Sequence, residues 1–218
     1  MQRTEKGTFR TLAWRGGGKK QRRGPEPLLV YMTDTERTAD PEIILQRLRP
    51  GTVVIFRHYD APDRLALGRR LARLCLRRGL IFVVAGDRRL ARRLHAAGLH
   101  LPEGMIRRRH RFVPAQDTWP VSAAAHDEKS AQRAGRAGAD LILLSPVFPT
   151  SSHPGRPALG LRRLAKVCRS VSVPVLALGG VGPATVRRVL ATGAAGVAGI
   201  GGLPQLCKDP FGWRARRS

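Results

Sequence analysis

Short runs of consecutive apolar residues recur along the chain and predict strands that are buried on both faces. Runs of this kind are typical of a parallel sheet whose two faces are both covered. The strong runs are LLVYMTD at 28–34, TVVIF at 52–56, LIFVVA at 80–85, LILLS at 141–145, VPVLAL at 173–178 and AGVAGI at 195–200. Two weaker runs, near 99–101 and 120–123, bring the expected number of strands to eight.

The segments between these runs have helical periodicity. In residues 61–79, for example, leucines form an apolar stripe against a background of arginines. Strands that alternate with helices indicate βαβ units, and eight such units predict an α/β protein with a single closed (β/α)8 TIM barrel. The alternative is an open doubly wound sheet, but the first run is followed by MTDTERTADP and not by the Gly-x-Gly-x-x-Gly turn of that fold.

Length and charge set the limits of this domain. The 218 residues, of which 42% are hydrophobic, suffice for one large domain. We expect the barrel at 27–208, with flexible basic tails at 1–26 and 209–218. The net charge of +25 comes from 40 Lys and Arg against 15 Asp and Glu. Because these cations are spread along most of the chain, the pattern favours a solvated surface or small anionic substrates and argues against a dedicated nucleic-acid partner.

The remaining composition indicates a cytoplasmic protein. The three cysteines, Cys75, Cys168 and Cys207, are far apart and form no paired motif, which predicts neither a zinc site nor a disulfide framework. The basic N-terminus has no apolar signal segment, and no apolar run approaches the length of a membrane span. The sequence is compatible with a homo-oligomer.

In a TIM barrel the active site lies at the carboxyl ends of the strands, which turns the polar residues there into candidates. They are Thr33, Asp34, Arg57, Tyr59, Asp87, His100, residues 122–126, residues 145–153, Gly179, Gly180, Gly201 and Gly202. Arg57 directly follows the second run, where a guanidinium could grip phosphate oxygens. Asp87 follows the third run and has two compatible interpretations, a Mg²⁺ ligand and the N-cap of the next helix.

Glycines and hydroxyls at the later strand ends suggest phosphate binding. Gly179 and Gly180 precede a helix expected to begin at Pro183, and Gly201 and Gly202 follow the last run. Glycines let the backbone approach a ligand, and the last two loops of such barrels commonly bind phosphate. The loop after the sixth strand supplies further hydroxyls, although such clusters are also ordinary loop chemistry. These hydroxyls belong to Ser145, Thr150, Ser151 and Ser152.

Two histidines lie near the weaker strands. His126 follows the fifth strand, where an imidazole could act as acid or base. His100 alternates with leucines, which favours a buried histidine of the barrel interior. Asp127 could cap the helix that follows.

The order of these motifs resembles the thiamine phosphate synthase and TenI-like family over about residues 28–204. VVIFR resembles the family's second strand with its arginine, and AGDRRLARRLHAAGLHLPEG resembles its segment NDrvdLAlaxgAdGVHLGqeD. SPVFPTSSH is similar to GPvFpTxTK, and ALGGV followed by GAAGVA is similar to AIGGI followed by GAdGvA.

The resemblance implies an enzyme of thiamine biosynthesis that joins hydroxymethylpyrimidine diphosphate to a thiazole phosphate with the help of Mg²⁺. In such a reaction the diphosphate leaves and the thiazole nitrogen attacks the pyrimidine methylene carbon. By the resemblance, Arg57 binds the diphosphate, Asp87 binds Mg²⁺ and Thr150 contacts the substrate. Gly180 and the backbone at Gly201 and Gly202 form the thiazole phosphate site.

The chain also departs from the family pattern. Tyr59 and His153 stand where the family has lysines, and Met105 replaces a second magnesium aspartate. His126 matches the family histidine, while Ser122 is a possible substitute for a nearby family serine.

The leading hypothesis is therefore a synthase. The alternatives are a TenI-like thiazole tautomerase that uses His126 as its acid/base, a barrel that only binds thiazole phosphate, and a basic protein that binds nucleic acid.

Overall fold

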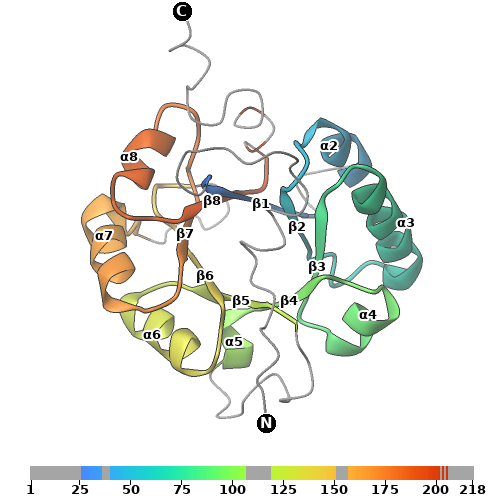
Figure 1. Cartoon of the computed structure of the whole chain (residues 1–218), viewed down its shortest axis with the longest axis horizontal. Helices are drawn as coiled ribbons and strands as arrows, with labels where there is room; N and C mark the ends of the chain where they lie inside the picture. Colours follow the sequence, from blue (N-terminus) through green and yellow to red (C-terminus); the bar gives the residue numbers. More distant parts are fainter. Residues whose placement is uncertain are drawn as a thin grey trace, which may run out of the picture.

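The computed structural model describes residues 26–35, 40–106, 119–150, 157–201, 203 and 205. Eight parallel strands pair in sequence order and close into a barrel, and the helices surround it (Figure 1). The strands are β1 (Leu28–Met32), β2 (Val53–Phe56), β3 (Ile81–Ala85), β4 (Gly98–Leu101), β5 (Val121–Ala125), β6 (Leu141–Leu144), β7 (Val175–Leu178) and β8 (Gly196–Gly199). The predicted TIM barrel is confirmed, including the two weakly signalled strands β4 and β5.

The helices of the described residues follow the strands as the periodicity indicates. They are α2 (Pro41–Arg47), α3 (Arg64–Arg77), α4 (Arg88–Arg93), α5 (Glu103–Ile106), α6 (Glu128–Arg136), α7 (Gly160–Ser170) and α8 (Val186–Leu190). Several begin at an aspartate whose side chain accepts a backbone N–H of the first turn, as Asp63 does from Ala66 at 2.8 Å. Such caps replace hydrogen bonds that a helix cannot make for itself.

Alternate residues of the strands divide the core into two layers. One cluster contains only residues of the strands and their ends, among them Val30, Ile55 and Val83, and fills the barrel. The other joins the opposite faces of the strands to the helices, for example Phe56 to Leu71. Because side chains alternate along a strand, residues that continue the parity of Val30 and Ile55 face the barrel axis.

Two elements differ from the sequence expectation. Helix α8 begins at Val186, three residues after Pro183, because residues 182–185 form a turn in which the Thr185 N–H donates to the Gly182 carbonyl oxygen at 3.0 Å. The helix N-terminus expected beside the glycine pair is therefore displaced from it. The short helix α5 had no sequence prediction.

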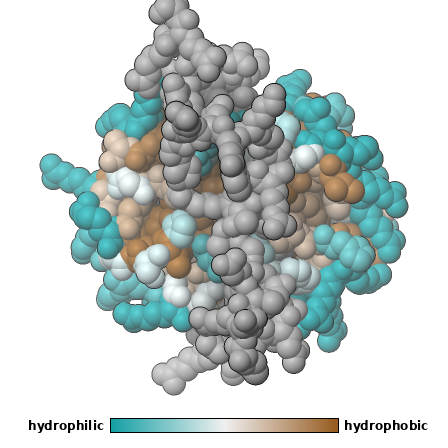
Figure 2. Space-filling model, viewed as in Figure 1, coloured by the Kyte–Doolittle hydropathy of each residue, from teal (hydrophilic) through white to brown (hydrophobic). Residues whose placement is uncertain are grey.

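Arginines dominate the outer face of the barrel. On α3, Arg69, Arg70, Arg73 and Arg77 are exposed while Leu71 and Leu74 are buried. Figure 2 shows hydrophilic side chains over the helices at the rim and more hydrophobic ones nearer the barrel. Within the described parts of the chain, no helix combines the length and apolarity needed to cross a membrane.

Candidate functional site

A cavity of about 280 Å³ lies at the carboxyl ends of β1, β2, β6, β7 and β8. Among the residues expected at the active site, Arg57, Thr150 and Gly179 line it, together with the strand-end residues Thr33 and Ser145. The other lining residues are Asp34, Thr35, His58, Tyr59, Asp60, Pro146, Leu178 and Ile200. This position agrees with the general location of active sites in TIM barrels.

Arg57 is held over the barrel mouth by Asp34. Both residues continue the inward parity of their strands, since Val30 and Ile55 belong to the cluster inside the barrel. The Arg57 guanidinium lies 3.3 Å from Asp34 Oδ2, and the two side chains are 30% and 12% exposed. Among the described residues Asp34 is the partner of this guanidinium, and its fixed orientation suits a bidentate contact with phosphate oxygens.

Thr33 joins Arg57 to the neighbouring His58. The Arg57 N–H donates to Thr33 Oγ1 at 2.9 Å, and the same oxygen lies 2.8 Å from His58 Nδ1. Burial lowers the pKa of His58; Asp34 acts in the opposite direction, and the nearby guanidinium groups of Arg57 and Arg64 lower the pKa further. The imidazole is therefore neutral at neutral pH and adds no positive charge to the cavity wall.

Tyr59 takes the place in the cavity where the family resemblance puts a lysine. Its side chain is 45% exposed, and the Arg64 guanidinium lies 5.2 Å from the ring centroid, a cation–π geometry. Arg64 is itself mostly buried, with its side chain 16% exposed. Tyr59 therefore does not supply the positive charge that a lysine at this position would bring to the cavity surface.

The glycine pair after β7 allows the loop after β6 to pack closely. Gly179 and Gly180 have φ values of +93° and +65°, in the left-handed region that favours glycine. The N–H groups of Val147 and Phe148 donate to the carbonyl oxygens of Leu178 and Gly179 at 2.9 and 3.0 Å. Gly179 lines the cavity, whereas a Cβ on Gly180 would lie 2.6 Å from the Phe148 Cβ. Gly180 therefore serves the packing of this loop.

Asp87 is the N-cap of α4, which confirms one of its two interpretations. Its Oδ1 accepts the Leu90 N–H at 2.9 Å, and its Oδ2 lies 3.7 Å from the Arg64 guanidinium. Asp87 does not belong to the cavity lining. Its neighbour Gly86 lies beside the cavity residue Tyr59, since a Cβ there would be 3.1 Å from the tyrosine ring.

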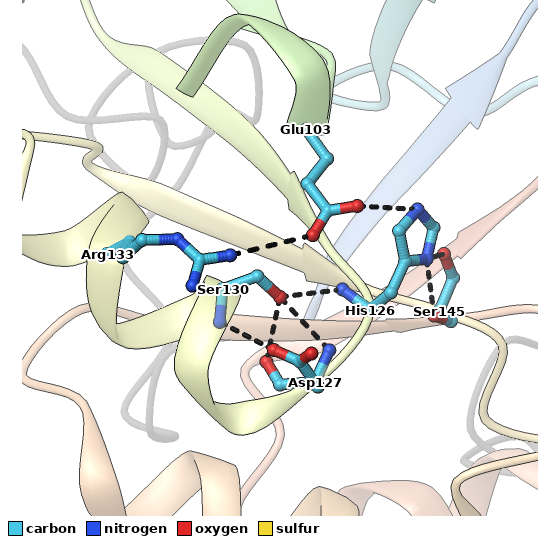
Figure 3. A network of polar contacts seen from close by, with 6 residues as sticks. All are labelled: Glu103, His126, Asp127, Ser130, Arg133 and Ser145. Atoms are coloured by element: carbon cyan, nitrogen blue, oxygen red, sulfur yellow. Dashed lines mark hydrogen bonds and ion pairs between the residues drawn. The ribbon is translucent and has the colours of Figure 1, made fainter. Parts of the chain in front are cut away.

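His126 lies at the end of β5 in a network of polar contacts (Figure 3). Its Nδ1 is 2.7 Å from the carbonyl oxygen of the cavity residue Ser145, and its Nε2 is 3.7 Å from Glu103 Oε2. Asp127 caps α6 with a reciprocal capping box that includes Ser130, which confirms the expected cap. Hydrogen bonds from Ser130 lower the pKa of Asp127.

His100 and Ser122 form a buried pair inside the barrel. The His100 side chain is 2% exposed, and its Nδ1 lies 3.0 Å from Ser122 Oγ. Burial lowers the pKa of His100 to about 3, with a smaller contribution from Arg57 in the same direction. The expected interior histidine is confirmed, and the Ser122 hydroxyl is directed to this histidine rather than to the cavity lining.

Some expected residues are not placed by the structure. Ser151, Ser152, His153 and Gly202 lie outside the described residues. Gly201 is described, is exposed and does not line the cavity.

Sequence reasoning also missed two residues with roles in this region, Arg64 and Glu103. Both lie beyond the strand ends, in helices α3 and α5, so the strand-end rule could not find them.

Comparisons with known proteins identify the family of this barrel. A family profile described as thiamine monophosphate synthase matches residues 29–203. The thiamine-phosphate synthase of Roseiflexus sp. (strain RS-1) is 35% identical over 185 residues, which cover 79% of this chain and 76% of that protein. The thiamine-phosphate synthase of Geobacillus kaustophilus is 33% identical over 191 residues, or 80% and 84% of the two chains.

The same relationship is visible in three dimensions. The solved structure of a thiamine phosphate pyrophosphorylase from Pyrococcus furiosus superposes with a TM-score of 0.69 and 25% sequence identity. The match covers 86% of this chain and 94% of that one. With its profile match across nearly the whole barrel, this chain belongs to the thiamine monophosphate synthase family.

Proposed function

We propose that this protein is a thiamine phosphate synthase, a transferase that joins hydroxymethylpyrimidine diphosphate to thiazole phosphate in thiamine biosynthesis. The observation that carries the proposal is the strand-end cavity, in which Arg57, Thr150 and Gly179 come together in a chain of this family. In this reaction a C–N bond forms between the thiazole nitrogen and the pyrimidine methylene carbon. The C–O bond to the diphosphate breaks, and the diphosphate leaves with the electron pair.

Arg57 is the group best suited to hold the leaving diphosphate. Negative charge builds up on the diphosphate as its bond to carbon breaks, and a fixed cation stabilises that charge more than it stabilises the bound substrate. Asp34 fixes the guanidinium from one side at 3.3 Å, and Thr33 fixes the backbone of the same residue at 2.9 Å. The side chain is thereby oriented before the substrate arrives.

Hydroxyl groups on the opposite wall complete the proposed substrate contacts. Ser145 and Thr150 line the cavity from the loop after β6, and the backbone at Gly179 approaches it from β7. Neutral hydroxyls and backbone N–H groups can bind phosphate oxygens without adding charge. We assign this wall to the phosphorylated substrates, together with Ser151 and Ser152, which directly follow Thr150 in the sequence.

Magnesium is part of the proposal as an ion carried by the diphosphate. Mg²⁺ is usually held by one or two carboxylates together with substrate phosphates and water. Among the described residues no three His, Cys, Asp or Glu side chains are grouped to hold a metal, and Met105 offers no oxygen where the family resemblance has its second aspartate. Asp87 is the residue that would contact such an ion, through Oδ2, because Oδ1 accepts the Leu90 N–H. It would do so from outside the cavity lining and in competition with the Arg64 guanidinium, which lies 3.7 Å from Oδ2. When bound, the ion would offset charge on the departing diphosphate.

The experiment that tests the proposal is the formation of thiamine phosphate from the two purified substrates, with and without Mg²⁺. We expect product in the presence of Mg²⁺ and a fall in rate when Arg57 is replaced by alanine. Arg69→Ala is the matched control, because Arg69 is an exposed arginine on the outer helix α3. Absence of product from the folded wild-type protein in both conditions would refute the proposal. We further propose that the reaction takes place in the cytoplasm, where cell fractionation should locate the protein.

A further inference from the structure

The contacts of His126 assign it a role that differs from proton transfer. Its ring lies between two groups of the protein, the backbone carbonyl of Ser145 at the end of β6 and the carboxylate of Glu103 in α5 (Figure 3). The His126 side chain is 24% exposed, and it is absent from the cavity lining to which Ser145 belongs. Each ring nitrogen faces an oxygen atom of the protein.

The contact on one side defines the proton on Nδ1. A carbonyl oxygen can only accept a hydrogen bond, so a distance of 2.7 Å between Nδ1 and the Ser145 carbonyl oxygen requires that Nδ1 carries the hydrogen. The Ser145 hydroxyl lies further away, at 3.3 Å from the same nitrogen. This hydrogen bond links the end of β5 to the residue from which the loop of Pro146 to Thr150 begins.

The contact on the other side occupies Nε2. Glu103 Oε2 lies 3.7 Å from this nitrogen, and Glu103 Oε1 lies 3.9 Å from the Arg133 guanidinium of α6. The Glu103 side chain is only 16% exposed, and a carboxylate with so little access to water requires cationic or hydrogen-bonding neighbours. Arg133 supplies one such neighbour, and the His126 ring lies against the other oxygen of the carboxylate. The Nε2 side of the ring therefore faces Glu103, and the Nδ1 side faces the Ser145 carbonyl oxygen.

The backbone of His126 is fixed as well. Its N–H donates to Ser130 Oγ at 3.0 Å, and the Ser130 N–H donates to Asp127 Oδ1 at 2.6 Å in the capping box of α6. Within the described parts of the chain, the charged groups near the ring include Glu103 of α5, Asp127 after β5 and Arg133 of α6. A ring restrained at both nitrogens and at its backbone cannot readily turn towards a substrate in the cavity.

We propose that His126 is a positioning residue: it holds the Ser145 carbonyl through Nδ1–H and so fixes the loop that carries Thr150, while Glu103 fixes the ring through Nε2. This role rests on the proposed function, because the loop is assigned to substrate binding. His126 does not exchange a proton with the substrate. A tautomerase would instead require His126 to act as an acid and a base.

Two amide substitutions separate the two roles. In His126→Asn the side-chain nitrogen can replace Nδ1 and still donate to the Ser145 carbonyl, but an amide cannot act as an acid or base at neutral pH. We expect His126→Asn to keep its kcat within about threefold of the wild type, and His126→Ala to raise the KM of the diphosphate substrate about 3- to 10-fold, the effect of losing one ordinary hydrogen bond. An acid/base role predicts that both variants lose activity about 100-fold or more. That result would overturn the proposal.

A spectroscopic measurement gives an answer that is independent of turnover. In ¹⁵N-edited NMR spectra of the histidine rings of the full-length protein, His126 should show a proton on Nδ1 that exchanges slowly, and the exposed His95 is the control. Glu103→Gln should shift the Nε2 signal and leave Nδ1 protonated. An unprotonated Nδ1 would overturn the proposal even if the enzyme is active. If the wild type forms no thiamine phosphate but Nδ1 is protonated, the proposed function fails while the assigned contact to Ser145 stands.

Discussion

Replacing Gly180 with alanine should displace the loop after β6 and destabilise the barrel. The residue has φ +65°, and a left-handed conformation costs a non-glycine residue about 1–2 kcal/mol. A Cβ would also lie 2.7 Å from the Pro149 carbonyl oxygen and 2.6 Å from the Phe148 Cβ. Because backbone atoms must move to relieve these contacts, overpacking adds about 1–3 kcal/mol. The free energy of unfolding should therefore fall by about 3 kcal/mol in total.

Thermal unfolding measures this loss. For a chain of this length about 3 kcal/mol corresponds to a Tm lower by roughly 6–12 °C. The matched control is Gly182→Ala, since a Cβ on Gly182 meets no atom within 4 Å and its φ lies outside the left-handed region. We expect Gly182→Ala to change stability by less than about 0.5 kcal/mol.

The same substitution should also affect catalysis. Phe148 and Pro149 precede Thr150, a residue of the cavity wall, so a shift of this loop should raise the KM of the substrates in Gly180→Ala but not in Gly182→Ala. Equal Tm values for the two variants would refute the packing role of Gly180. A lower Tm with an unchanged KM would show that the loop position is not coupled to substrate binding.

Three further outcomes follow from individual side chains. The folded-state pKa of His100 is about 3, below the value of 6.5 for the free side chain, so the unfolded chain binds the extra proton and stability is lost as pH falls below 6.5. In urea titrations the free energy of unfolding should fall by about 1.4 kcal/mol per pH unit. This fall should be absent in His100→Asn, where the amide can still contact Ser122. An equal pH dependence of stability in both proteins would contradict the shifted pKa of His100. Asp87→Asn should keep the cap on Leu90 and the wild-type Tm while weakening Mg²⁺-dependent turnover. Asp87→Ala should in addition lose about 1 kcal/mol of stability, because it removes the cap. Equal Tm values for Asp87→Asn and Asp87→Ala would argue against the cap. Arg57→Ala should lower kcat/KM about 10- to 100-fold through loss of a charge-assisted contact, and a rate close to that of wild type would exclude Arg57 from diphosphate binding.

The strand positions and the region of the site could be predicted from the sequence because both depend on local patterns. The apolar runs placed all eight strands, and the end of the second strand identified Arg57. The partner of Arg57 could not be predicted from a local pattern. Asp34 lies 23 residues away in the chain, and the two meet because β1 and β2 are neighbours and both side chains keep the inward parity.

Other assignments depended on contacts that no local pattern contains. Gly180 was expected to bind phosphate, which stays a prediction, and its left-handed backbone and close approach to Phe148 also give it a packing role. His126 was expected to be an acid or base, and its two ring contacts come from β6 and α5. Residue type alone allowed several roles for each of these residues.

The sequence by itself determined the class of fold, the number of strands and the family, because hydrophobic periodicity and ordered motifs are properties of the chain in one dimension. Only the tertiary structure decided which strand-end residues line the cavity, which hydrogen bonds each side chain makes and which carboxylate faces His126. The physical reason is that three effects arise only when distant segments pack together. They are the inward or outward direction of a side chain, the close approach of two loops and the removal of water from a buried group. Those three effects set the orientation of Arg57, the packing at Gly180 and the pKa of His100.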